Sequence, residues 1–328
     1  MRHAHHFASL TPRAELIAVC SPVQAELDAA AKEFPDVHTY TDYDQMLFKE
    51  ETLQAVIVAS TTIAHAEQAI KAIELGLHSE SVVDAYKTSL ESHPNQKVIC
   101  GFSRRFDTSY RDAHKRIVNG SIGRPSVFRS QTCDKLSPID FFVKDAESSC
   151  GIFLDCSIHD IDLALWFFGE ESNLKSVTAV GITAVQPDLR KPHDRDNALG
   201  ISEFYGGKMA QLYCSRMMAA DQEYCTEILG TEGKIAVDTQ PQLNLVNLYE
   251  PGGIRREIPA DFYERFKEAF VTEANEFTAS CLDNTPAPLQ LDSAVKAVAI
   301  ACALQESLIT GKKIEFDENG RRLVGSKL

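Results

Sequence analysis

Hydrophobic positions in the first hundred residues fall into short continuous runs separated by longer amphipathic stretches. The runs lie at residues 15–20, 37–40, 53–59 and 97–102. Short apolar runs bounded by turn signals are typical of strands buried on both faces. Helical patterns occupy residues 23–34, 42–50 and 63–75, the second beginning at the capping residue Asp42. Strands that alternate with helices at this spacing predict an α/β fold with a doubly wound parallel sheet of the Rossmann type.

After residue 105 the pattern changes to strands of alternating polarity. These are predicted at residues 126–133, 177–184, 198–204, 208–217, 224–230 and 234–239, with 243–249 continuing the series. Gly206-Gly207 and Thr231-Glu232-Gly233 are predicted hairpin turns. Helices are predicted at 108–119, 261–282 and 292–310. The chain is therefore expected to have two domains. Residues 1–105 would form an incomplete, Rossmann-like nucleotide-binding domain, and 106–328 an α+β substrate and dimerisation domain with a large mixed or antiparallel sheet.

The stretch from Ser149 to Gly169 combines an apolar stripe with acidic residues and one imidazole. Taken as a single helix, it places Asp155 and His159 on the same face because they are four positions apart. His159 would then serve as an acid or base with a pKa near working pH, and Asp155 would orient it or bind a substrate hydroxyl. The alternative is a core histidine satisfied by a neighbouring carboxylate.

Composition narrows the class of protein. The chain has 328 residues, 44% hydrophobic and 24% charged, with a net charge of −14. Such an acidic chain is a poor general binder of nucleic acid or anionic membranes. We find no apolar run of membrane-spanning length and no signal peptide, and therefore expect a cytoplasmic protein. Nine scattered cysteines without a C-x-x-C spacing indicate reduced thiols, with no disulfide framework and no metal site.

Polar residues follow the predicted parallel strands, where ligands of open α/β sheets bind. Ser21 follows the first run, the group Ser60, Thr61 and His65 follows the third, and Arg104 follows the fourth. Hydroxyl groups beside a helix N-terminus suit the phosphate or ribose of a nucleotide. The competing interpretation is that Ser60 and Thr61 only cap the helix that follows them.

Three runs together resemble a known family. They are A-S-T-T-I-A-H-A-E-Q-A at 59–69, G-F-S-R-R-F-D at 101–107 and G-I-F-L-D-C-S-I-H-D-I-D-L-A-L-W-F-F-G at 151–169. In this order they resemble the Gfo/Idh/MocA oxidoreductases, the group of glucose–fructose oxidoreductase and inositol dehydrogenase. The run F-Y-E-R-F-K-E-A-F-V-T-E-A-N-E-F at 262–277 most resembles the inositol 2-dehydrogenases.

The resemblance implies an NAD- or NADP-dependent oxidoreductase that acts on CH–OH groups. It would transfer hydride between the nicotinamide and a ring hydroxyl of a sugar, inositol or related polyol, and would assemble as a homodimer or homotetramer. His159 matches the family's catalytic histidine, and Asp155 matches the aspartate that binds the reacting hydroxyl. The positions of Ser60, Thr61 and His65 match the loop along the cofactor, and Arg104 matches a residue near the site.

The sequence also departs from the family pattern. A first strand with its G-x-G-x-x-G turn is not found ahead of residue 15, and Ser21 stands where an acidic residue would bind the ribose diol of NAD. The E-K-P segment with the family's lysine is missing after Gly76-Leu77-His78. Either these pieces have been removed from an ordinary dehydrogenase, or the chain is a diverged, catalytically inactive member that senses or binds a ligand.

Overall fold

The computed structural model describes residues 2–10, 13–60, 62–74, 90–91, 93–136, 151–191, 193–219 and 222–323. By its internal contacts the chain divides into two compact units. Unit 1 comprises Met1–Ser103 and Glu268–Asp292, and unit 2 comprises Arg104–Lys267 and Ser293–Leu328. The main division falls next to the boundary expected at residue 105. Glu268–Asp292, expected in the second domain, groups with unit 1 instead.

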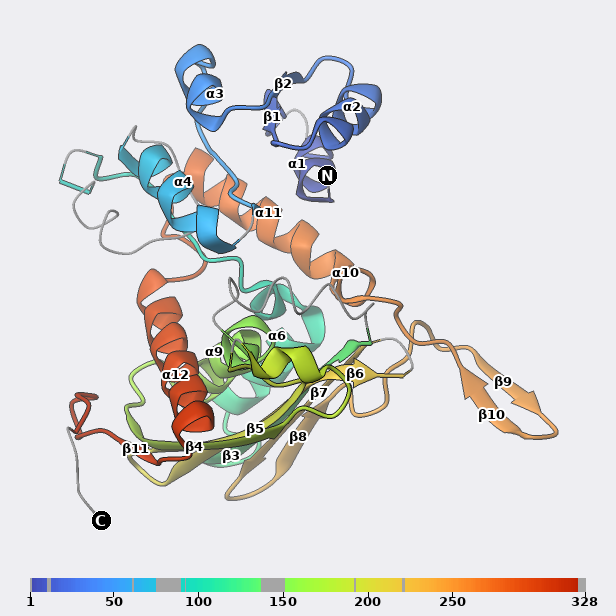
Figure 1. The fold of residues 1–328 in the computed structure, drawn as a ribbon, viewed down its shortest axis with the longest axis vertical. Coiled ribbons are helices and arrows are strands. Elements are labelled where there is room, and N and C mark those ends of the chain that lie inside the picture. Colours follow the sequence, from blue (N-terminus) through green and yellow to red (C-terminus); the bar gives the residue numbers. More distant parts are fainter. Residues whose placement is uncertain are drawn as a thin grey trace. The chain divides into compact units, whose positions relative to one another are not determined.

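The described residues of unit 1 form one pair of strands and several helices (Figure 1). Its elements are α1 (Arg2–Ala8), β1 (Ala18–Cys20), α2 (Gln24–Glu33), β2 (His38–Tyr40), α3 (Tyr43–Lys49), α4 (Thr62–Glu74) and most of α11 (Lys267–Leu282). The strands β1 and β2 pair in parallel, as the sequence pattern predicts, with Ala18 opposite His38. Asp42 caps α3 as expected, because its side chain accepts a hydrogen bond from the backbone N–H of Gln45.

Two further strands predicted for unit 1 are not regular strands in the part of the chain that the structure describes. Residues 53–59 and 97–102 each contribute only one bridge residue, Ala55 and Val98. The burial that the pattern predicts is nevertheless present, since Val56 and Val58 pack with Ala69 and Ala72 of α4. Apolar character thus predicts burial, whereas a strand also needs a neighbouring backbone with which to pair.

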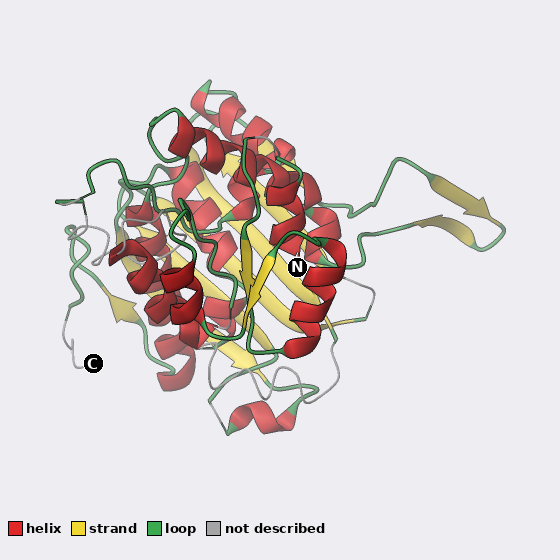
Figure 2. Ribbon diagram, turned by 90° about the horizontal axis from the view of Figure 1, so that it is seen from above, coloured by secondary structure: helices red, strands yellow, loops and turns green. Residues whose placement is uncertain are grey.

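Unit 2 is built on a seven-stranded sheet (Figure 2). Its strands are β3 (Pro125–Lys135), β4 (Leu174–Ile182), β5 (Asn197–Phe204), β6 (Lys208–Met218), β7 (Glu223–Gly230), β8 (Lys234–Val237) and β11 (Ile314–Glu315). They lie in the order β11-β4-β5-β6-β3-β7-β8. The β3–β6 pair is parallel and the others are antiparallel, so the sheet is mixed, as predicted. Gly206 and Gly207 form the predicted turn with φ of 80° and 73°, a region that favours glycine.

The remaining elements of unit 2 are helices and one separate hairpin. They are η1 (Ser103–Phe106), α6 (Thr108–Val118), α8 (Ile152–Asp155), α9 (Ile158–Phe168), η2 (Pro187–Arg190), β9 (Asn247–Glu250), β10 (Gly253–Arg256), α10 (Phe262–Arg265) and α12 (Leu291–Thr310). Helices α6, α9 and α12 lie on one face of the sheet (Figure 1). The run 243–249, predicted to continue the sheet, instead contributes β9 to a hairpin with β10 that projects away from it.

Helix α12 corrects the expectation that no apolar run reaches membrane-spanning length. Among the described residues, its 20 residues are long and apolar enough to span a bilayer, with 56% of the window buried inside the protein. A core helix passes the same test of length and composition. In the structure Ser307 of α12 accepts a hydrogen bond of 3.0 Å from the backbone N–H of Ala179 in β4, and Leu304 is fully buried. Packing against the sheet therefore accounts for the apolar face of α12.

Candidate functional site

The predicted catalytic segment is not one helix. Its chain turns at Cys156 and Ser157, so that Asp155 ends α8 and His159 lies in the first turn of α9. The expectation that the two side chains share one helix face was therefore wrong. Gly151 precedes α8 with φ of 96°, and a Cβ there would lie 2.2 Å from the side chain of Gln305. This close approach explains why glycine occupies the start of the segment.

Asp155 lies at the solvent side of an ion-pair network. Its Oδ2 accepts a hydrogen bond of 2.6 Å from Nη2 of Arg216, and 32% of its side chain is exposed. Arg216, on β6, also donates from Nη1 to Asp194 at 2.6 Å. Burial alone would lower the pKa of Arg216, but the carboxylates of Asp155 and Asp194 raise it, so the guanidinium stays charged. An ionised pair thus stands behind the exposed carboxylate.

His159 lies in a setting that disfavours its charged form. Burial lowers its pKa to about 3, and the positive charge of Arg104 contributes further. The imidazole is therefore neutral at working pH, which corrects the expectation of a pKa near that pH. A neutral ring can accept a proton, but a low pKa makes it a weaker base than an ordinary histidine.

Arg104 is held inside unit 2. It donates to Asp160 at 2.6 Å and to Thr132 at 2.9 Å, and its guanidinium lies over the rings of Tyr224 and Phe266 at 4.8 and 5.5 Å. Its exposed fraction is 4%. The guanidinium thus bonds to groups of the protein itself, and through Asp160 it holds the start of α9 in place. The predicted place of Arg104 beside the cofactor stays a prediction.

The neighbouring Arg105 forms a similar pair with a carboxylate two residues further along α9. It donates to both carboxylate oxygens of Asp162, at 2.8 and 2.6 Å, and to Glu170. Burial raises the pKa of Asp162 to about 6, although Arg105 opposes the shift. The motif R-R at 104–105 and the D-I-D at 160–162 are thus partners, which fasten α9 to η1.

A second carboxylate lies near Asp155. Oδ2 of Asp134 is 3.3 Å from Sγ of Cys156, whose thiol is also 3.8 Å from Asp155, and Oδ1 of Asp134 accepts from Gln222 at 3.0 Å. Burial raises the pKa of Asp134, and the nearby charge of Asp155 adds to this shift. Burial also raises the pKa of the Cys156 thiol, which makes it a poor nucleophile.

Apart from Arg104, the residues predicted to bind the cofactor belong to unit 1. The Ser21 hydroxyl follows β1, donates to Glu26 at 2.5 Å and accepts from the backbone N–H of Val23 at 3.1 Å. Ser60 donates to the side chain of Gln68 of α4 at 2.6 Å. This is not a cap, because a capping side chain accepts a hydrogen bond from a backbone N–H of the first turn, so the capping interpretation stays a prediction. His65 lies on α4, and Thr61 lies outside the described residues.

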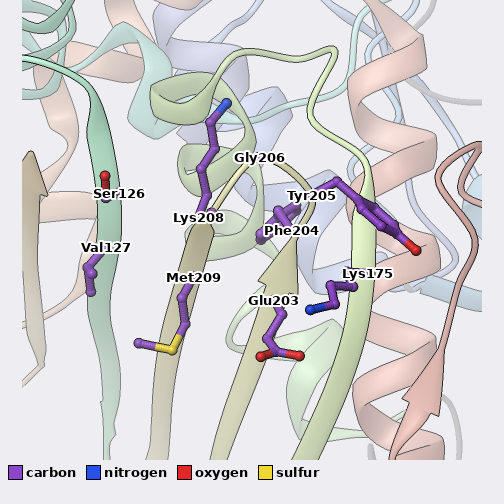
Figure 3. A pocket seen from close by; sticks show the side chains of 10 residues that line it. Ser126, Val127, Lys175, Glu203, Phe204, Tyr205, Gly206, Lys208 and Met209 are labelled. Atoms are coloured by element: carbon purple, nitrogen blue, oxygen red, sulfur yellow. The ribbon is translucent and has the colours of Figure 1, made fainter.

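Other features of the structure do not enlarge this site. The pocket in Figure 3, about 430 Å³, lies around the β5–β6 hairpin and contains none of the predicted site residues. Two of its charged residues already have partners, since Lys208 donates to Ser172 and Glu203 accepts from Ser176. Within the residues that the structure describes, no group of three His, Cys, Asp or Glu side chains could hold a metal ion.

Sequence reasoning missed Arg216, Asp194 and Asp134. Arg216 and Asp194 come from β6 and from the loop before β5, and Asp134 lies near the end of β3. A charged residue within an apolar strand, such as Arg216 between Ser215 and Met217, was the available signal. Because buried charges are paired in proteins, that position predicts a partner without saying which one.

Comparison with known proteins identifies the class. Residues 1–80 match the oxidoreductase family with an NAD-binding Rossmann fold, and residues 110–236 match the GFO/IDH/MocA C-terminal domain. The scyllo-inositol 2-dehydrogenase (NAD(+)) of Bacillus subtilis is 31% identical over 324 residues, which cover 96% of this chain and 92% of that protein. The chain therefore belongs to the Gfo/Idh/MocA family of NAD-binding oxidoreductases.

Further relatives and solved structures agree with this assignment. The myo-inositol 2-dehydrogenase of Thermotoga maritima is 26% identical over 83% of this chain and 82% of its own length. The crystal structure of scyllo-inositol dehydrogenase from Lactobacillus casei with bound NAD(H) and scyllo-inositol is 33% identical, with a TM-score of 0.88 over 96% of this chain and 95% of that one. The family and the Rossmann-type fold class predicted from the sequence are confirmed.

Proposed function

We propose that this protein is an NAD-dependent dehydrogenase of inositol or a related polyhydroxylated ring. The observation that carries the proposal is the Asp155 carboxylate, a third exposed and braced by Arg216, followed in the chain by the neutral His159. Both positions match the family motif at 151–169. We further infer a cytoplasmic homodimer or homotetramer, as the family resemblance implies.

The proposed chemistry divides the work between these two side chains. Asp155 accepts a hydrogen bond from the reacting hydroxyl and orients it, while His159, being neutral, takes the hydroxyl proton at one of its ring nitrogens. The nicotinamide, when bound, supplies the hydride acceptor. Asp160 and Arg104 hold α9, and with it His159, in place through their 2.6 Å contact.

The carboxyl end of β1 suits NAD better than NADP. Glu26 lies there, joined to Ser21 by a hydrogen bond of 2.5 Å, and can accept hydrogen bonds from the ribose diol. It supplies the acidic group that is absent from position 21 itself. A 2′-phosphate would meet the negative charge of Glu26, so we expect NAD to be preferred.

The first experiment is a titration of the purified protein with NADH and NADPH, followed by turnover of scyllo- and myo-inositol with NAD⁺. We expect NADH to bind more tightly, and His159→Ala to lower turnover by roughly 10²–10⁴-fold. Asp155→Asn is expected to lower turnover and also raise KM. Unchanged turnover in His159→Ala would remove that residue from the proposed mechanism.

A second candidate is a ligand-binding member of the family without turnover. The pKa of about 3 for His159 favours it, because so weak a base transfers a proton slowly. The E-K-P lysine missing from the sequence points the same way. Binding of NADH and inositol, without reduction of NAD⁺ at any pH between 6 and 10, would support this candidate over the enzyme.

A further inference from the structure

Arg216 is a buried charge that contacts the predicted substrate-binding carboxylate from behind. Its side chain is 1% exposed, and its two terminal nitrogens reach different partners, Asp194 and Asp155, each at 2.6 Å. Asp194 is fully buried, whereas 32% of the Asp155 side chain is exposed. The single positive charge of Arg216 thus faces two carboxylates. The unbalanced negative charge lies on the Asp155 side, which is exposed to solvent.

The same network fixes both ends of the short helix α8. Asp194 accepts the backbone N–H of Ile152, the first residue of α8, at 2.9 Å through its other oxygen. Arg216 holds the last residue, Asp155. The backbone of Arg216 is itself fixed, because its N–H donates to the carbonyl of Asp196 at 2.8 Å. A four-residue helix has too few bonds of its own to set a direction, so this network orients it.

We propose that Arg216 is a positioning residue, which aims the Asp155 carboxylate at the reacting hydroxyl. The proposal rests on the proposed function of Asp155. A guanidinium is planar and spans two acceptors at once, which the single ammonium group of lysine does not reproduce. Reacting groups are sensitive to such placement, since a shift of about 1 Å can cost roughly 10²-fold in rate.

The test is a double-mutant cycle with Arg216→Lys and Asp155→Asn, which keeps a positive charge beside the buried Asp194. Alone, Arg216→Lys is expected to lower kcat/KM for inositol by roughly 10²-fold, with the Kd for NADH unchanged. In the Asp155→Asn background the same change should have an effect within roughly twofold. Additive losses in the double variant would overturn the proposal, because Arg216 would then act independently of Asp155.

The matched control is Arg265→Lys. Arg265 joins Asp107 and Asp238 at 2.9 and 2.6 Å in a similar two-acceptor arrangement, with 16% of its side chain exposed. The Arg265→Lys variant should have a kcat/KM within roughly twofold of that of the unchanged protein. A loss equal to that of Arg216→Lys would assign the effect to general destabilisation and would also overturn the proposal.

Failure of the proposed function gives a different result. If the protein neither oxidises scyllo-inositol with NAD⁺ nor binds it in the presence of NADH, the polyol assignment fails. The same double-mutant cycle is then measured by thermal unfolding. Changes in Tm that are not additive for Asp155→Asn and Arg216→Lys would support an Arg216 that holds the Asp155 carboxylate in position. Additive changes in Tm would reject it.

Discussion

The two units use their apolar segments differently. In unit 2 seven strands form one continuous sheet, whereas the only strand ladder among the described residues of unit 1 joins β1 and β2, three residues each. Both units bury what their sequences predict: Val58 and Val98 of unit 1 are as inaccessible as Phe128 and Leu212 of unit 2, all below 7% exposed. The difference lies in strand pairing rather than in hydrophobicity.

Connectivity explains the contrast. Strands β5 and β6 are joined by the Gly206-Gly207 turn, so their antiparallel pairing follows from local geometry. The β1–β2 pair is parallel and needs α2 as a crossover, as every pair in a doubly wound sheet does. Short hairpins join β5 to β6 and β7 to β8 in unit 2, whereas the β1–β2 ladder of unit 1 forms only across an intervening helix.

The largest expected effect concerns the buried pair in unit 2. Arg104→Met leaves Asp160, which is fully buried, without its cation, and should lower the free energy of unfolding of unit 2 by about 3–5 kcal/mol. The single tryptophan, Trp166 in α9, makes urea unfolding of unit 2 visible by fluorescence. The control is Arg129→Met, whose side chain is 53% exposed beside Glu227 and should matter by less than about 1 kcal/mol. Equal losses in the two variants would mean that burial does not set the strength of these pairs.

A smaller effect depends on pH. The pKa of His159 is lowered to about 3 in the folded state from 6.5, so the unfolded chain takes up the proton first as the pH falls. Stability from His159 is therefore complete above about pH 6.5 and is lost below it, by about 2 kcal/mol at pH 5. The stability difference between the unchanged protein and His159→Gln, followed by urea unfolding from pH 7.5 to 5, should change by that amount.

The raised pKa of Asp162, about 6, works in the opposite direction. Its folded carboxyl takes up a proton before the unfolded one, so its contribution to stability falls as the pH rises toward 6. Asp162 is present in both the unchanged protein and the His159→Gln variant, so its contribution cancels from the stability difference between them. A difference that stays constant between pH 7.5 and 5 would contradict the lowered pKa of His159.

The smallest effect lies in unit 1. Asp42→Ala removes the side-chain acceptor of the Gln45 N–H at the start of α3 and should cost about 1 kcal/mol. Amide hydrogen exchange within α3 measures it, and Trp166 fluorescence should not change, because the tryptophan belongs to unit 2. Asp36→Ala, at an exposed position before β2, is the control. Faster exchange in both variants would remove the role assigned to the cap.

Much of the candidate site could be located from the sequence, but the hydrogen bonds and ion pairs between its side chains could not. The motif at 151–169 led to Asp155 and His159, and the strand ends led to Ser21 and Ser60. Their partners were predictable only where they are local, as in the five-residue step from Ser21 to Glu26. The pair of Asp155 and Arg216 spans 61 positions, and no periodicity links residues so far apart.

The sequence by itself determined which segments are buried, where the turns and caps fall, and to which family the chain belongs, because these depend on side-chain polarity, backbone preference and motif order. Tertiary structure decided that the helix breaks between Asp155 and His159, and that Arg104 is used by Asp160. It also decided the neutral state of His159. Burial and charge pairing depend on which distant strands meet, and that is set only when the whole sheet has assembled.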